Sequence, residues 1–313
     1  MNIRSHNRQR WALGDFLRLV RVWNLPTAIV DPYVGYMIAA GAESVSAFRL
    51  CAAMVISALV YSAGMAANDL FDIERDKTLH PDRPLPAGLI SKKTAGRFTA
   101  LLIFLGLCAA YSLGPRVFLL CLGLVLLTFT YNGWLKHRGL IGCLNMGACR
   151  LVNMWLGIAA AGGNKTIREL WPLPATLAIY VAAITLLSLQ EEHKLDKKGL
   201  YALVSGILLT LLPLAGFAVD RAGPHGSAWL ALVPLTLLAG WVFATAAVAA
   251  RSLTPGAIGS VVRVAVTGII LLDSAILFSQ GKPVEGVVCA LVLAPALLLI
   301  RYTAKRPAVA PTA

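Results

Sequence analysis

The chain has 313 residues, of which 58% are hydrophobic and only 14% are charged. A soluble domain cannot cover that much apolar surface with polar side chains, so the composition excludes an ordinary water-soluble protein and predicts a membrane protein. The net charge of +13 would suit a nucleic-acid-binding protein, but the Lys and Arg residues are dispersed through short loops, which excludes nucleic acid as a partner.

The first 23 residues form a basic amphipathic segment. Its arginines, at positions 4, 8, 10, 18 and 21, alternate with Trp11, Leu13, Phe16, Leu17 and Trp23. This pattern predicts a segment that lies on an anionic membrane face. We expect no cleavable signal peptide, because the first long apolar run begins late and has no short apolar region with a cleavage site.

Ten mainly apolar segments follow, each long enough to cross a hydrocarbon core of about 30 Å. They lie near residues 24–42, 48–70, 94–114, 116–134, 139–161, 172–192, 199–219, 227–250, 257–279 and 283–302. The sequence therefore predicts an all-α, multi-pass transmembrane bundle of nine to ten helices over residues 24–302, with nine crossings if one late segment is re-entrant. Residues 303–313 are expected to form a short cytoplasmic tail.

The distribution of Lys and Arg predicts the orientation. With the N-terminus in the cytoplasm, most of the 28 basic residues fall in inside segments, as the positive-inside rule requires. The C-terminal Arg301, Lys305 and Arg306 are then inside too, which favours an even number of crossings. We expect an integral protein of the bacterial inner membrane with its polar loops on the cytoplasmic side.

The end of the second apolar segment carries the first acidic cluster. Asn68, Asp72 and Asp76 are spaced i, i+4, i+8, which puts an amide and two carboxylates along one helix face. Like charges at this spacing repel, so they need a compensating cation, and hard oxygen ligands suit Mg²⁺. The alternative is a solvated helix end balanced by Arg75 and Lys77.

A proline-punctuated cationic loop follows these acids. It runs from Lys77 through His80, Arg83 and Pro84 to Gly88 and cannot continue the helix. We expect Lys77 and Arg83 to hold phosphate oxygens beside a metal ion.

A second polar cluster ends the sixth apolar segment, from Gln190 to Lys198. Glu192 and Asp196 are again spaced i, i+4, although a charged stretch like this is also typical of a solvated helix end. Its interest comes from the expectation that it lies on the same membrane face as the first cluster.

These residues resemble the UbiA superfamily of membrane prenyltransferases. Its first aspartate-rich motif reads NxxxDxxxD and precedes a loop like RPxRPxxxG; here the stretch reads NDLFDIERDKTLHPDRPLPAGLIS. The match continues in YNGWLK, residues 131–136, and Asn24 resembles a polar residue of the first helix. The resemblance covers about residues 18–198, whereas the last third matches only as apolar helices.

The resemblance implies a metal and diphosphate site. Asn68, Asp72 and Asp76 would hold Mg²⁺ and the diphosphate, and Lys77, Arg83, Tyr131 and Lys136 would contact diphosphate oxygens. Glu191, Glu192 and Asp196 would form a second metal site. Two departures are His80, where the family has the first Arg of its loop, and the second motif, QEEHKLD, which holds a single aspartate.

Asn145, Arg150 and Asn153 lie within an apolar segment. Together with the stretch that begins Tyr131-Asn132 and with the altered second motif, this segment looks most like the UbiA-like branch found in bacterial ebo gene clusters. Arg150 and Asn153 share a helix face that we expect to line a substrate cavity, while interhelical hydrogen bonding without substrate contact is the alternative.

The predicted function is that of a membrane prenyltransferase that uses Mg²⁺ to ionise a polyprenyl diphosphate and transfers the prenyl group to a small or aromatic acceptor, which the sequence does not identify. A transporter is an alternative, although we find no inverted repeat. A catalytically altered binding or scaffold protein is another, favoured by the altered second motif and opposed by the intact first motif.

Overall fold

The computed structural model describes residues 13–40, 45–162, 167–191, 195–222 and 226–304. These ranges are helical, with turns between the helices and no strand among them. The predicted all-α class is therefore confirmed. Arg4, Arg8, Arg10 and Trp11 of the basic N-terminal segment lie outside the described residues.

Each of the ten predicted apolar segments contains helix. The bounds are α2 (Leu25–Ala39), α3 (Ala47–Phe71), α5 (Lys92–Leu113), α6 (Pro115–Thr130), α7 (Leu140–Ala161), α9 (Pro172–Ser188), α10 (Lys197–Leu209), α11 (Leu212–Ala222), α12 (Leu232–Ala249), α13 (Pro255–Thr267), α14 (Ile269–Ser279), α15 (Pro283–Leu291) and α16 (Leu293–Ala304). Shorter elements are η1 (Val22–Asn24), α4 (Ile73–Leu79), the π-helical turn η2 (Tyr131–Leu135), α8 (Ile167–Leu170) and η3 (Ala228–Ala231).

In the described part of the chain, 8 helical stretches are long and apolar enough to cross a membrane. The apolar helix α9 has 17 residues and is shorter. Helix α2 has 15 residues, and nearly all of them are buried among its neighbours. The protein is thus a multi-pass integral membrane protein, and its short helix α2 lies among longer neighbours.

Three of the predicted segments are each divided into two helices. Pro213 lies in the first turn of α11, directly after the break from α10, where its missing N–H costs no helical hydrogen bond. Gly268 separates α13 from α14, and Pro295 lies just after the break between α15 and α16. Local backbone chemistry at Pro213, Gly268 and Pro295 thus accounts for each division.

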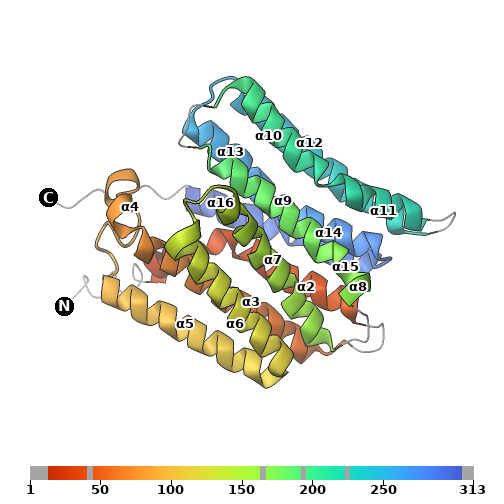
Figure 1. Ribbon diagram of the computed structural model, residues 1–313, viewed down its shortest axis with the longest axis horizontal. Helices are drawn as coiled ribbons and strands as arrows, with labels where there is room; N and C mark the ends of the chain where they lie inside the picture. The colour runs from red at the N-terminus through yellow and green to blue at the C-terminus, as the bar shows by residue number, and fades with distance from the viewer. Residues whose placement is uncertain (1–12, 41–44, 163–166, 192–194, 223–225, 305–313) are drawn as a thin grey trace, which may run out of the picture.

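The helices lie alongside one another in a bundle (Figure 1). The α3–α4 junction, the α6–α7 connection and the end of α9 all lie toward the left in this view. The first acidic cluster and the end of α9, which precedes the second cluster, therefore share one end of the molecule. That this end faces the cytoplasm stays a prediction.

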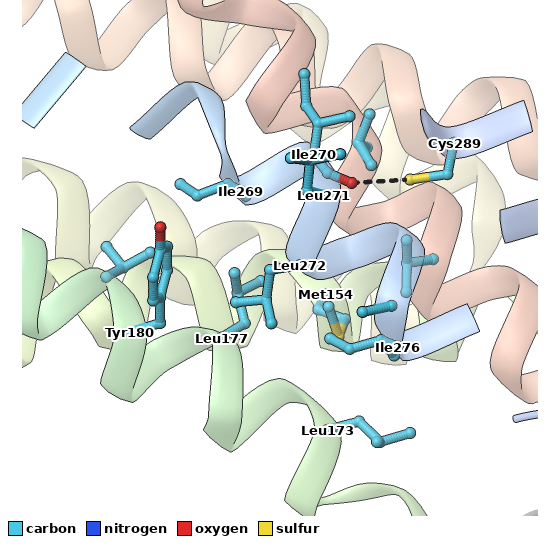
Figure 2. Close-up of a cluster of buried hydrophobic side chains, with 14 of the residues drawn as sticks. Met154, Leu173, Leu177, Tyr180, Ile269, Ile270, Leu271, Leu272, Ile276 and Cys289 are labelled. Carbon is cyan, nitrogen blue, oxygen red and sulfur yellow. Dashed lines mark hydrogen bonds between the residues drawn. The ribbon is translucent and has the colours of Figure 1, made fainter. Parts of the chain in front are cut away.

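Helices α2 and α7 approach each other closely along their lengths. A Cβ atom at Gly35 would lie 2.0 Å from the Met154 carbonyl oxygen, and one at Gly157 would lie 2.0 Å from the Pro32 carbonyl oxygen. Small residues at such crossings let helix backbones touch in a membrane. The neighbouring core, in which Leu177 and other large side chains pack around α14, is shown in Figure 2.

We predict that Gly157→Ala destabilises the protein, because the added methyl group would overlap backbone atoms of α2. The expected loss is about 1–3 kcal/mol, typical of overpacking. Gly123→Ala in α6 is the matched control, since nothing lies within 4 Å of a Cβ there. Thermal unfolding in detergent checks this; equal melting temperatures for the two variants would contradict the close approach.

Candidate functional site

Helix α3 ends in a cluster of buried acids. Asp72 lies at the junction of α3 and α4, where the Asp72 amide donates to the Asn68 carbonyl at 3.0 Å and the Asp76 amide donates to the Asp72 carbonyl at 2.8 Å. The i to i−4 pattern thus continues across the junction. Asp69 and Asp76 are each 2% exposed, so these carboxylates are not the solvated helix end that the alternative interpretation requires.

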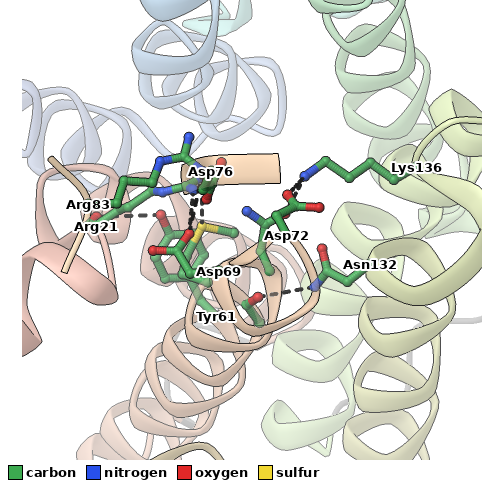
Figure 3. Close-up of polar contacts among 11 residues, drawn as sticks. Arg21, Tyr61, Asp69, Asp72, Asp76, Arg83, Asn132 and Lys136 are labelled. Carbon is green, nitrogen blue, oxygen red and sulfur yellow. Dashed lines mark hydrogen bonds and ion pairs between the residues drawn. The ribbon is translucent and has the colours of Figure 1, made fainter. Parts of the chain in front are cut away.

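Lys136 connects this cluster to the α6–α7 connection. Its Nζ atom donates to Asn68 Oδ1 at 2.7 Å and forms an ion pair with Asp72 (Figure 3). Lys136 follows the π-helical turn η2, which is fastened to α3 because Asn132 Nδ2 donates to the Gly64 carbonyl at 3.1 Å. The YNGWLK stretch therefore places a lysine against the first acidic motif.

Two arginines hold the other carboxylates. Arg83 Nη1 lies 2.5 Å from Asp76 Oδ2 and 3.8 Å from Asp69 Oδ1. Arg21 Nη2 donates to Asp69 Oδ1 at 2.9 Å (Figure 3). Three buried carboxylates thus meet three cations that come from three separate parts of the chain, and their formal charges balance.

Sequence reasoning did not assign Arg21 and Asp69 to the site. Arg21 adopts the left-handed backbone conformation, with φ 49°, which is strained for a residue with a side chain. This backbone turn separates the N-terminal helical residues from η1 while the side chain reaches Asp69. The sequence signals that could have identified them were the position of Asp69 directly after Asn68 and the position of Arg21 close to the predicted start of the bundle.

His80 lies in the loop between α4 and Arg83. Loss of hydration, followed by the nearby Arg83 guanidinium, lowers the pKa of His80 from its ordinary value of 6.5. His80 is therefore mainly neutral at physiological pH, whereas the arginine of the family pattern would be charged. The departure at this position removes one positive charge from the site.

Other predicted site residues lie apart from the acid cluster. Lys77 is exposed and pairs with Glu74 at 2.8 Å. Asp196 is exposed and caps α10 by accepting from the Gly199 amide at 2.7 Å. Glu191 is half-buried, with its carboxylate beside Gly259 of α13. Glu192 lies outside the described residues, so the second metal site stays a prediction.

A cavity of about 360 Å³ lies within the bundle. Its polar lining includes the predicted residues Asn24, Tyr131, Arg150 and Asn153, together with Arg21, Ser57, Tyr61, Thr128, Thr185 and Ser188. Its apolar lining includes Val60, Leu124, Met146, Val181, Ile184, Val262, Val266 and Ile269. Arg21 links the cavity to the acid cluster, because it lines the cavity and pairs with Asp69. The lining residues do not include Asn68, Asp72, Asp76, Arg83 or Lys136.

Arg150 and Asn153 make up part of the cavity wall. Arg150 donates to the Thr27 carbonyl at 2.7 Å and to Asp31 Oδ2 at 3.0 Å, while Asn153 Nδ2 donates to Asp31 Oδ2 at 2.8 Å. Asn145 is buried beside Cys149, whose thiol lies 3.8 Å from it, and is not among the lining residues. We predicted two alternatives for Arg150, a place in the cavity wall or hydrogen bonds between helices. The structure shows both for this side chain.

The donor set at the end of α3 suits a hard divalent cation, because it consists of an amide oxygen and carboxylates. Among the described residues, no three His, Cys, Asp or Glu side chains converge closely enough to hold an ion unaided. Mg²⁺ commonly binds proteins through one or two carboxylates and completes its shell with water and substrate phosphates. The residues present fit that mode of binding, in which the phosphates supply part of the shell.

A sequence profile of the UbiA prenyltransferase family matches residues 29–199. The digeranylgeranylglyceryl phosphate synthase of Sulfurisphaera tokodaii is 31% identical over 171 residues, which are 54% of this chain and 60% of that protein. The corresponding synthase of Sulfolobus acidocaldarius is 33% identical over 166 residues, which are 52% and 60% of the two chains. The match thus spans about 60% of the length of these relatives.

Solved structures share the fold across most of the chain. A digeranylgeranylglyceryl phosphate synthase aligns with a TM-score of 0.59 and 21% identity, covering 87% of this chain and 99% of that one. A UbiA homologue from Archaeoglobus fulgidus, bound to GPP and Mg²⁺, aligns with a TM-score of 0.57 and 14% identity, covering 92% and 99%. From the profile match over more than half of its length, the chain belongs to the UbiA prenyltransferase family.

Proposed function

We propose that the protein is a Mg²⁺-dependent prenyltransferase that takes its prenyl group from a polyprenyl diphosphate. The observation that carries this proposal is a balanced cluster of buried acids and cations that Arg21 connects to a largely apolar cavity. A purely structural ion-pair network does not account for the cavity, and a pocket that binds only lipid chains does not account for the buried charges. Membership of the family supports the same activity.

The diphosphate would bind at the acid cluster. Asn68, Asp72 and Asp76 are the residues that would hold Mg²⁺, which would supply positive charge to the leaving group. Arg83 and Lys136 now pair with these carboxylates, and their N–H donors would turn to diphosphate oxygens. Preorganised positive charge of this kind favours cleavage of the allylic C–O bond because negative charge develops on the diphosphate.

The prenyl chain would lie along the apolar side of the cavity. Val262 and Val266 of α13 and Ile184 of α9 line it, and they offer no nucleophile to a carbocation. A binding site of about 360 Å³ falls within the usual range for small-molecule pockets. We assign the site to the cytoplasmic end of the bundle, because the basic loops predict that orientation.

The acceptor would bind beside Arg150 and Asn153. Asn153 Oδ1 is buried and has no donor among the described residues, yet the side chain lines the cavity. A buried unsatisfied acceptor is costly, so a ligand that brings an O–H or N–H hydrogen would be favoured there. This supports an acceptor with a hydroxyl or amino group in place of a purely hydrocarbon one.

The main test is diphosphate release from geranylgeranyl diphosphate by the purified chain. We expect the release to require Mg²⁺ and to fall at least about 100-fold in Asp72→Ala, comparable to the loss of one preorganised charge-stabilising group. Glu74→Ala is the matched control, because Glu74 lies two residues away but is exposed and pairs with Lys77 outside the buried cluster.

Two results would contradict the proposal. One is release that continues without any divalent cation. The other is equal activity of the Asp72→Ala and Glu74→Ala variants, which would show that the buried cluster does not act on the diphosphate.

A second prediction concerns chain length. Val266→Trp would fill part of the apolar cavity, so turnover of geranylgeranyl diphosphate should fall by at least about 10-fold, roughly the effect of 1.4 kcal/mol. Dimethylallyl diphosphate serves as the internal control, since its short chain leaves the deeper cavity free. Equal losses for the two substrates would place the prenyl chain elsewhere.

A further inference from the structure

A group of buried polar side chains lies behind the cavity wall, among α2, α7 and α14. Asp31 of α2 and Asp273 of α14 are both 0% exposed, and neither lines the cavity. Ionisable residues at membrane depth are expensive and mark function more often than packing. The proposed diphosphate chemistry uses neither of these two acids, so they need an account of their own.

Asp31 is held by two donors from α7. Its Oδ2 atom accepts from Arg150 Nη1 at 3.0 Å and from Asn153 Nδ2 at 2.8 Å. Arg150 is fixed further because Nη1 donates to the Thr27 carbonyl at 2.7 Å and Nη2 donates to Thr27 Oγ1 at 3.1 Å. These contacts identify Asp31 as the ionised partner of Arg150.

Asp273 has a different environment. Its carboxyl group lies beside that of Asp31, within hydrogen-bonding reach. Yet among the described residues neither oxygen of Asp273 has a donor, and Asp31 Oδ1 has none either. Three buried acceptor oxygen atoms on two neighbouring carboxyl groups are thus left without a hydrogen-bond donor.

A single proton shared by the two acids would remove both the excess negative charge and the lack of a hydrogen-bond donor. With both acids ionised, the group would contain two negative charges and the single positive charge of Arg150, and a net negative charge would be buried. With a proton on Asp273, the group becomes neutral and Asp273 gains an O–H that can donate to Asp31 Oδ1. Asp273 is the site of the proton because Asp31 already has Arg150 and Asn153 as partners.

Among the residues that the structure describes, Arg150 is the positive charge that acts on Asp273. The titratable groups that face it are Asp31, Arg150 and Cys289 of α15. The Cys289 thiol donates to the Ile270 carbonyl at 3.5 Å (Figure 2). The adjacent Leu272 and Ile276 of α14 are fully buried apolar side chains.

We propose that Asp273 is a neutral acid that donates a hydrogen bond to Asp31, and that this pair of acids positions Arg150 on the wall of the substrate cavity. Asp273 is then a positioning residue, since it touches no cavity surface itself. The proposal relies on the proposed function only for the role of the cavity. The protonation state and the support of Arg150 can be tested without turnover.

The test compares variants of the full chain in detergent by infrared spectroscopy and thermal unfolding. The wild-type spectrum should contain a protonated-carboxyl C=O band that shifts in D₂O and is absent from Asp273→Asn. Because a neutral amide can still donate to Asp31, Asp273→Asn should melt within about 3 °C of wild type. Asp31→Asn should melt well below it, since Arg150 would lose its buried counter-charge.

A double variant tests the link to Arg150. In Asp31→Asn the buried charge of Arg150 has no counter-charge. Adding Arg150→Met removes that charge, so the double variant should melt at a higher temperature than Asp31→Asn alone. The proposal is overturned if Asp273→Asn keeps the carboxyl band, or if it melts as low as Asp31→Asn, because either result would mean that Asp273 is ionised. No recovery in the double variant would overturn the positioning role, and the assay of diphosphate release is independent of all these outcomes.

Discussion

The pairing of buried carboxylates with cations from distant segments holds the polar end of the bundle together. Asp69, Asp72 and Asp76 occupy little more than two helical turns, and such a concentration of negative charge would be strongly unfavourable without partners. The partners come from the N-terminal segment, the loop after α4 and the α6–α7 connection. Each ion pair therefore also joins a separate part of the chain to α3, to α4 or to the junction between them.

The same constraint explains how the site can serve a diphosphate. In the structure the carboxylates and the cations satisfy one another, so the charges are balanced before any ligand binds. A metal ion would bring positive charge to the carboxylates, and a diphosphate would bring negative charge to the cations. The present ion pairs would then be replaced by pairs with the ligands, and no buried charge would be left unpaired. A ligand that brought only one sign of charge would upset that balance.

A second network gives the cavity its polar wall. Here the close contact of α2 with α7, which Gly35 and Gly157 permit, brings Asp31 within reach of Arg150 and Asn153. The cavity thus has Arg21 and a fixed set of hydrogen-bonding groups in its wall, together with apolar side chains. This arrangement suits a substrate with a diphosphate, a hydrocarbon chain and a polar reaction partner.

Local patterns in the sequence predicted the helices and much of the site, because these depend on residues close together in the chain. The spacing of Asn68, Asp72 and Asp76 predicted one shared face, and the motif resemblance predicted that Arg83 and Lys136 would join it. Distant pairing is not encoded in such patterns. Arg21 was therefore missed, and so was Asp31, although a lone carboxylate in an apolar segment was a signal. The pairing of Asp31 with Asp273 depends on helix packing that a single sequence does not reveal.

The most direct test of the central claim is a crystal structure of the protein soaked with geranyl diphosphate and Mn²⁺, using the anomalous signal of the metal. The account predicts a Mn²⁺ peak between the diphosphate and the carboxylates of Asp72 and Asp76, with Arg83 and Lys136 turned to the phosphate oxygens and the prenyl chain in the cavity. A diphosphate bound elsewhere, or bound with the acid cluster still paired internally and no metal peak beside it, would contradict the account.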